Sequence, residues 1–254
     1  MAHIDGLYPS ASRKTGDRVE VITYPTELET LTPNFNACPR IQQMLDAKYA
    51  TEEYQNFISK NKDFLDRITR ITQMTFWGTK YYVFSDALLP RICHNMKLPC
   101  NAEGECVTKE DVEKIYVDGN WENKFRYGYV DIARLMVGHF ANELRDSMAQ
   151  GNKMGYPRYA LFSGHDDTLT PLLAGLGISV DIWPPYASNL VFELWRAKGT
   201  MPAEMKLFVR AVYNGEVLKI PGCSKEGGAL CTWDEFSKII DNNLTIKDYE
   251  KECF

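Results

Sequence analysis

One stretch decides how this sequence folds: YALFSGHDDTLTPLLAGL, residues 159 to 176. The apolar run Tyr159–Phe162 predicts a buried strand, and the small residues that follow it predict a turn. From Thr168 onward, leucines recur at helical spacing as far as Leu176. We therefore expect a strand, a tight turn and a helix in direct succession.

Three titratable side chains lie at this turn: His165, Asp166 and Asp167. In open α/β sheets, ligands bind beyond the carboxyl ends of the strands, and a helix N-terminus attracts anions. This placement favours phosphate chemistry, with His165 and Asp166 as candidate catalytic residues and with Asp167 and Thr168 as candidate pocket residues. A loop whose aspartates only cap the helix explains the same pattern, so both interpretations stay open at this point.

Composition restricts the class of protein. The 254 residues are 44% hydrophobic, which is enough for a large core in one domain with or without a subdomain. A formal net charge of −5 argues against nucleic acid as the main partner. No apolar run reaches the roughly 20 residues that a transmembrane helix needs, and no signal peptide is visible at Met1.

Helical patterns dominate residues 38–125, which we expect to form a mostly helical cap or insert. A charged helix is expected to run to about Ile71, and an apolar helix over Tyr82–Ile92 is expected to break near Pro90. Thr108 begins a further helix with a cap-like start. The longest predicted helix covers Phe125–Ala149.

Strand patterns flank this helical block. Val19–Tyr24 alternates as a strand does, and so does Leu190–Trp195. Lys206–Tyr213 leads through Asn214-Gly215, a strong hairpin signal, into another strand, and a last helix is expected from Thr232 to Ile240. The sequence predicts an α/β fold, a three-layer α/β/α sandwich with a mixed sheet, as one domain over residues 1–254.

Seven cysteines are present, and none forms a Cys-x-x-Cys pair. A structural metal site is not expected, whereas Cys100 with Cys106 and Cys223 with Cys231 suit local disulfides. The tripeptide Asn243-Leu-Thr matches a glycosylation acceptor. Together these features favour an oxidising compartment.

The motifs at residues 163–169, at 184–188 (PPYAS) and at 193–194, in this order, resemble the histidine acid phosphatases of the lysosomal and prostatic type. The stretches NACPR at 36–40, HNMKLP at 94–99 and PGCS at 221–224 also follow the order of that family. The resemblance covers essentially the whole chain.

This resemblance implies phosphomonoester hydrolysis through a phosphohistidine intermediate, without a cofactor or a metal. In the family, an Arg-His-Gly-x-x-Arg motif on the first strand supplies the nucleophilic histidine and arginines that hold the phosphate. His165 matches the second histidine, which assists phosphate binding, and Asp166 matches the proton donor. Asp167 stands where the family usually has a small hydroxyl residue. Trp183 and Tyr186 rim the pocket or serve in packing, and packing is the more ordinary role.

The chain contains no Arg-His-Gly, because His3, His94 and His139 lie in other contexts. Residues Met1–Pro9 match the stretch that follows the family's phosphate-binding arginines. We therefore expect the nucleophile strand to lie upstream of Met1, the domain to be incomplete at its N-terminus, and the chain alone to be inactive.

The resemblance also implies disulfides between Cys38 and Cys253 and between Cys223 and Cys231; loop proximity adds Cys100 with Cys106 and leaves Cys93 free. It implies a phosphomonoester substrate, a secretory-pathway location, lysosomal or extracellular, and it allows a homodimer. Two alternatives stay open. One is a noncatalytic binding protein, and the other is a phytase-like or lysophospholipid-directed member of the superfamily.

Overall fold

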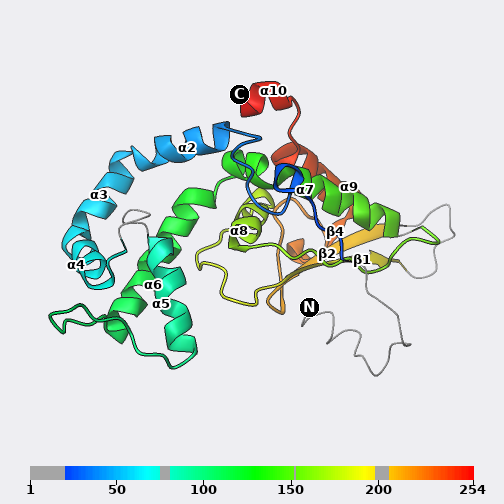
Figure 1. Cartoon of the computed structure of the whole chain (residues 1–254). Helices are drawn as coiled ribbons and strands as arrows, with labels where there is room; N and C mark the ends of the chain where they lie inside the picture. The colour runs from blue at the N-terminus through cyan, green and yellow to red at the C-terminus, as the bar shows by residue number, and fades with distance from the viewer. Residues whose placement is uncertain (1–20, 75–80, 152, 198–205) are drawn as a thin grey trace.

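The computed structural model describes residues 21–74, 81–151, 153–197 and 206–254. Its long helices lie in two groups, one along an arm that contains α3 to α6 and the other around a small sheet (Figure 1). The helices are α2 (Arg40–Tyr49), α3 (Glu52–Lys60), α4 (Lys62–Thr72), α5 (Tyr81–Cys93), α6 (Lys109–Tyr127), α7 (Val130–Gly151), α8 (Asp166–Gly175), α9 (Trp233–Ile239) and α10 (Tyr249–Cys253). Short helical turns are η2 (Thr26–Leu28), η4 (Glu226–Gly228) and η5 (Ile240–Leu244).

The described sheet has four strands: β1 (Leu190–Arg196), β2 (Leu207–Tyr213), β3 (Glu216–Val217) and β4 (Cys231–Thr232). Each of its pairings is antiparallel, and the β1–β2 register places Glu193 opposite Arg210, whose side chains form an ion pair at 2.6 Å. Asn214 and Gly215 both have positive φ, as a tight hairpin requires. The predicted hairpin and the α/β fold class are confirmed.

In the described part of the chain, the segment Tyr159–Phe162 is not a strand, contrary to the prediction. It is also not buried, since Tyr159 and Leu161 are 54% and 49% exposed. Residues 21–24 of the predicted Val19–Tyr24 strand are not part of a strand in the described chain, and residues 19 and 20 lie outside it. A strand exists only where a partner completes its hydrogen bonds, and alternation of side chains does not supply that partner. A mixed sheet, as predicted, contains at least one parallel pair of strands, whereas the pairs in the described sheet are antiparallel.

Two predicted helices are each divided into two. The charged helix expected to reach Ile71 is two helices, α3 and α4, which meet at Asn61. The helix expected over Phe125–Ala149 is divided between α6 and α7, with Gly128 as the C-cap of α6. Conversely, α5 continues through Pro90 to Cys93, where a break was predicted. The spacing of apolar residues predicts which face of a helix is buried. Where the helix begins and ends depends on capping contacts, which are seen only in the folded chain.

Two apolar cores hold these elements. One lies in the arm, where Leu65 and Ile68 of α4, Phe84 and Leu88 of α5, and Ile115 of α6 are almost completely buried. The other joins α2, α7, α8, α9 and the sheet. We propose that residues 38–125 form a helical cap within a single domain, since the arm has its own core. Residues Met1–Pro9, which match the stretch after the family's phosphate-binding arginines, lie outside the described residues.

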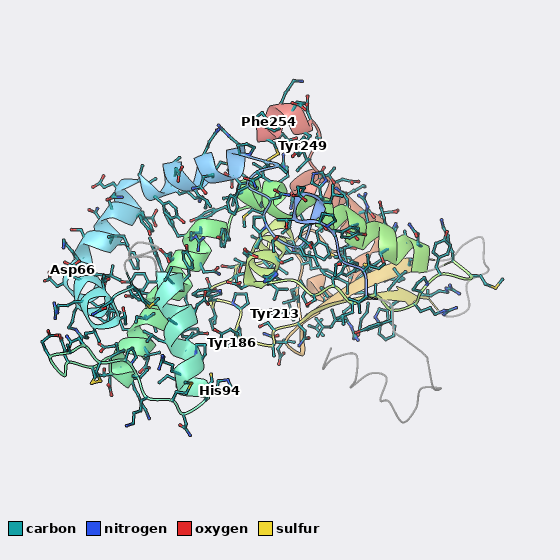
Figure 2. All side chains as sticks on the ribbon, in the orientation of Figure 1. Asp66, His94, Tyr186, Tyr213, Tyr249 and Phe254 are labelled. Atoms are coloured by element: carbon teal, nitrogen blue, oxygen red, sulfur yellow. A yellow bond between two sulfur atoms is a disulfide. The ribbon has the colours of Figure 1, made fainter. Side chains whose placement is uncertain are left out.

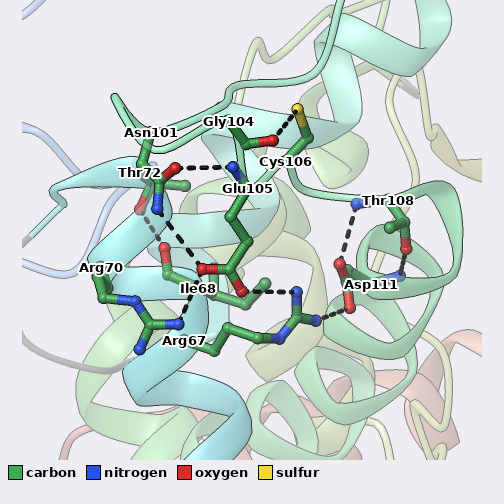
Figure 3. A network of polar contacts seen from close by, with 10 residues as sticks. All are labelled: Arg67, Ile68, Arg70, Thr72, Asn101, Gly104, Glu105, Cys106, Thr108 and Asp111. Carbon is green, nitrogen blue, oxygen red and sulfur yellow. Dashed lines mark hydrogen bonds and ion pairs between the residues drawn. The ribbon is translucent and has the colours of Figure 1, made fainter.

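Three disulfides join the pairs Cys38–Cys253, Cys100–Cys106 and Cys223–Cys231, and Cys93 is free and exposed. The loop closed by Cys100–Cys106 is tied to the arm by the ion pairs in Figure 3. Its Glu105 accepts a hydrogen bond from Arg70 at 2.9 Å, while Arg67 pairs with Asp111, which also closes the capping box of α6 with Thr108.

The glycosylation tripeptide lies in a packed turn. The Asn243 amide donates to the Gly175 carbonyl at 2.8 Å, and Leu244 is fully buried. A Cβ on Gly175 would lie 2.3 Å from Leu244 Cδ2, so this contact requires glycine. A carbohydrate on Asn243 would therefore have to replace the bond to Gly175.

In the described part of the chain, no helix combines the length and the apolar character that crossing a membrane requires.

Replacing both Cys38 and Cys253 by serine should destabilise the protein strongly, because this bridge spans 215 residues of sequence. Loop-closure entropy predicts a loss of about 5 kcal/mol in the free energy of unfolding, against about 2 kcal/mol for the Cys100–Cys106 pair, which spans 6 residues. Urea unfolding of the two double variants measures both values. Equal losses from the two variants would contradict this ranking.

Candidate active site

The site is built around the first turn of α8. His165 is the N-cap, in extended backbone conformation, and Asp166 and Asp167 are the first two residues of the helix. Backbone N–H groups in the first turn of a helix have no intrahelical acceptor and carry partial positive charge. The His165 side chain is exposed, so this end of α8 presents an imidazole beside a positive helix end.

Thr168 holds this turn in place. Its Oγ1 accepts a hydrogen bond from the His165 N–H at 2.9 Å and donates to the Leu31 carbonyl oxygen. A Cβ on Gly164 would lie 2.8 Å from Thr168 Oγ1, so a larger residue would push the hydroxyl away. Gly164 and Thr168 thus shape the turn, and Thr168, predicted as a pocket residue, is buried and structural.

The Asp166 carboxylate is held by a residue from the loop that follows α8. The indole Nε1–H of Trp183 donates to Asp166 Oδ2. Trp183 is 9% exposed, so its ring is packed in the interior while its N–H contacts Asp166. A carboxylate so held has a defined orientation, which proton transfer requires.

Asp167 has the opposite environment. Its Oδ1 is buried and has no hydrogen-bond partner in the described residues. Burial and the neighbouring Asp166 carboxylate raise the pKa of Asp167 to about 6, although His165 and Arg126 oppose this shift. Removing a carboxylate from water disfavours its charged form, so Asp167 exchanges its proton in mildly acidic solution.

Arg126 is the buried cation behind this turn. Its guanidinium lies 4.5 Å from the centre of the Tyr82 ring and 4.3 Å from that of Tyr127, and it donates to the Tyr127 hydroxyl. Glu122, one turn earlier on α6, is also buried and accepts a hydrogen bond from the Tyr54 hydroxyl at 2.8 Å. Arg126 is committed to these aromatic neighbours, so it influences Asp167 through its charge.

The arm adds another carboxylate. Burial and the charge of Asp166 raise the pKa of Asp86 on α5. Burial, and after it the charges of Asp86, Cys93 and Asp166, raise the pKa of Tyr186, whose position between the arm and the sheet is visible in Figure 2. Sequence reasoning assigned no role to Asp86 or Arg126, because a single charge in a helical pattern carries no sign of what faces it.

The arrangement offers an exposed imidazole, an oriented carboxylate and a partly protonated one at a positive helix end. These groups can bind an oxyanion and transfer a proton to or from it. Within the described residues, no three His, Cys, Asp or Glu side chains are placed to hold a metal ion.

Replacing Asp167 by asparagine should stabilise the protein at neutral pH. The raised pKa means that the folded state binds this proton more tightly, so ionisation costs stability as the pH rises from about 4 to about 6 and remains costly above it. We expect the variant to gain about 2 to 3 kcal/mol in the free energy of unfolding at pH 7 and little at pH 4.

Asp181→Asn is the matched control, because hydrogen bonding and charge from Lys124 lower the pKa of Asp181. Its effect should have the opposite sign, a loss of stability at pH 7. Urea unfolding at both pH values measures the two variants, and a loss of stability in Asp167→Asn at pH 7 would contradict the burial argument.

Known proteins carry the same sequence pattern. Residues 1–214 match the family "Histidine phosphatase superfamily (branch 2)". Counting factor 60 of Dictyostelium discoideum is 26% identical, over 99% of this chain and 58% of its own length. Human lysosomal acid phosphatase is 27% identical over 99% of this chain and 60% of its own, and human prostatic acid phosphatase is 26% identical over 92% and 60%.

The phytase of Citrobacter braakii has a similar fold, with a TM-score of 0.65 at 12% identity, over 99% of this chain and 76% of that structure. The chain spans about three fifths of the length of the curated relatives that it matches. With the family pattern covering residues 1–214 and the His-Asp turn at the start of α8, this chain belongs to the histidine phosphatase superfamily, branch 2.

Proposed function

We propose that this chain carries the proton-donor half of a phosphomonoester hydrolase site of the acid phosphatase type. The observation that carries the proposal is the turn before α8, where an exposed His165 adjoins Asp166 at the positive end of the helix. Lysosomal and prostatic acid phosphatases among the relatives support the same chemistry.

In the proposed reaction, His165 stabilises negative charge on the phosphoryl oxygens. A nucleophilic histidine attacks phosphorus, the P–O bond to the alcohol breaks, and Asp166 gives its proton to the departing oxygen. A water molecule then attacks the phosphohistidine, and Asp166 takes the proton that this water loses. Covalent catalysis divides one high barrier into two lower ones, and the same carboxyl serves as acid and then as base.

The nucleophile of this reaction comes, in our proposal, from outside the described residues. His94 follows the end of α5, and the His139 ring lies on α7, 5.8 Å from the ring of Tyr249. Neither lies in the Arg-His-Gly context that the reaction uses, and no Arg-His-Gly occurs in the 254 residues. A noncatalytic protein that binds a phosphorylated ligand at His165 is the second candidate, and the same missing motif favours it.

We place the protein in the secretory pathway, lysosomal or extracellular. Three disulfides need an oxidising compartment, and the related lysosomal and prostatic acid phosphatases support this location.

Residues 1–254 expressed alone should hydrolyse p-nitrophenyl phosphate no faster than their His165→Ala, Asp166→Asn double variant does, because both proteins lack the nucleophile. Release of p-nitrophenolate from pH 4 to pH 7 measures this. Clear turnover by the unmodified chain that disappears in the double variant would contradict an external nucleophile.

The natural transcript separates the two candidate functions. If it encodes Arg-His-Gly-x-x-Arg in frame upstream of Met1, the full protein should hydrolyse p-nitrophenyl phosphate, and Asp166→Ala should lower kcat by about 100-fold or more, the usual contribution of a general acid. If it does not, the enzyme proposal fails and the noncatalytic one stands.

A further inference from the structure

Trp183 is a buried residue whose indole N–H makes a hydrogen bond that packing alone does not require. It lies in the loop between α8 and β1, in the sequence Ile182-Trp183-Pro184-Pro185, and its side chain is almost completely buried. Within this buried position its one polar atom, Nε1, donates to Asp166 Oδ2. A buried indole N–H needs an acceptor, and here the acceptor is the proposed proton donor of the reaction.

Helix α6 fixes the indole. The backbone N–H of Trp183 donates to the Asn120 side-chain oxygen at 2.9 Å. Next to Asn120, a Cβ built on Gly119 would lie 3.4 Å from two ring carbons of Trp183 and 3.4 Å from Ser85 Oγ. The ring therefore lies directly against the α6 backbone, and the two prolines after it limit the movement of the loop. Trp183 thus connects the position of the arm to the orientation of Asp166.

We infer that Trp183 is a positioning residue, which directs the Asp166 carboxyl so that Oδ1 carries the transferred proton. This rests on the proposed function of Asp166. An N–H that donates to Oδ2 stabilises negative charge on that oxygen, and in the described residues no hydrogen bond reaches Oδ1. The acid proton therefore resides on Oδ1, the oxygen free to face the leaving group.

The chemistry of indole suits this role. Its N–H is a donor only and does not ionise, so it cannot take the proton that Asp166 must give. A lysine or arginine in its place would add a charge beside the carboxylate. Tryptophan orients the carboxyl without adding a charge to the site.

The contact can be tested without any activity. The sequence has five tryptophans, and the indole N–H signal of Trp183 in a ¹H–¹⁵N spectrum is identified by its loss in Trp183→Phe. In Asp166→Ala this signal should shift toward that of a free indole and exchange faster with water. The Trp233 signal, assigned through Trp233→Phe, should stay in place in the same protein. A Trp183 signal that does not move in Asp166→Ala overturns the inference.

The positioning role is tested by leaving groups, on the full natural protein. Trp183→Phe keeps an aromatic ring at this position and removes the N–H donor together with part of the bicyclic ring. For β-glycerophosphate, whose alkoxide leaves poorly, kcat should fall about tenfold, as expected for a hydrogen bond to a charged group. From p-nitrophenyl phosphate, p-nitrophenolate leaves almost without protonation. For this substrate kcat should therefore fall by less than about threefold. KM should not change for either substrate.

Trp233→Phe is the matched control, since it removes an indole for which no hydrogen bond occurs in the described residues, and it should change neither value. Equal losses of kcat for both substrates in Trp183→Phe would show a role in packing only and overturn the inference. If the unmodified full protein hydrolyses neither substrate, the proposed function fails and the proton-transfer role of Trp183 fails with it. The spectrum then still decides, separately, whether Trp183 holds Asp166.

Discussion

The hydroxyl of Thr168 is the contact on which the candidate site depends. It accepts from the His165 N–H and donates to the Leu31 carbonyl, and so it joins the start of α8 to a residue 137 positions away in the sequence. Thr168 itself is buried, where an unpaired hydroxyl would be costly. Packing against α7 and α6 holds the body of α8, and the Thr168 hydroxyl holds its first turn. Together they set where the imidazole and both carboxylates point.

Two adjacent carboxylates acquire different properties from this placement. Asp166 faces the indole of Trp183, a neutral donor that orients it, whereas Asp167 turns into a buried environment in which one oxygen has no partner. Sequence neighbours on a helix point about 100° apart, so they reach different surroundings even within one turn. The pair resembles other acid–base sites in which environment, and not residue type, separates two carboxyl groups.

Much of the site could be predicted from local sequence. The Gly-His-Asp-Asp-Thr pattern indicates a turn, a helix start and three titratable groups at one point, and the structure places α8 there. The contributions of Trp183, Asp86 and Arg126 could not be predicted, because each reaches the site from another element. Trp183 had one usable signal, a tryptophan before two prolines in a loop, but that pattern indicates packing as readily as a contact with a carboxylate.

By itself the sequence determined the starts of α6, α8 and α9 and the hairpin at Asn214-Gly215, since these depend on residues that are close together. Motifs in order determined the family, and the family resemblance implied the Cys38–Cys253 pair. Tertiary structure decided which of the predicted strands form, because a strand needs a partner, and Leu190–Arg196 has one in Leu207–Tyr213. It also decided the protonation of Asp167 and the contact of Trp183 with Asp166. Desolvation and hydrogen-bond partners arise from packing between distant elements, which no local pattern encodes.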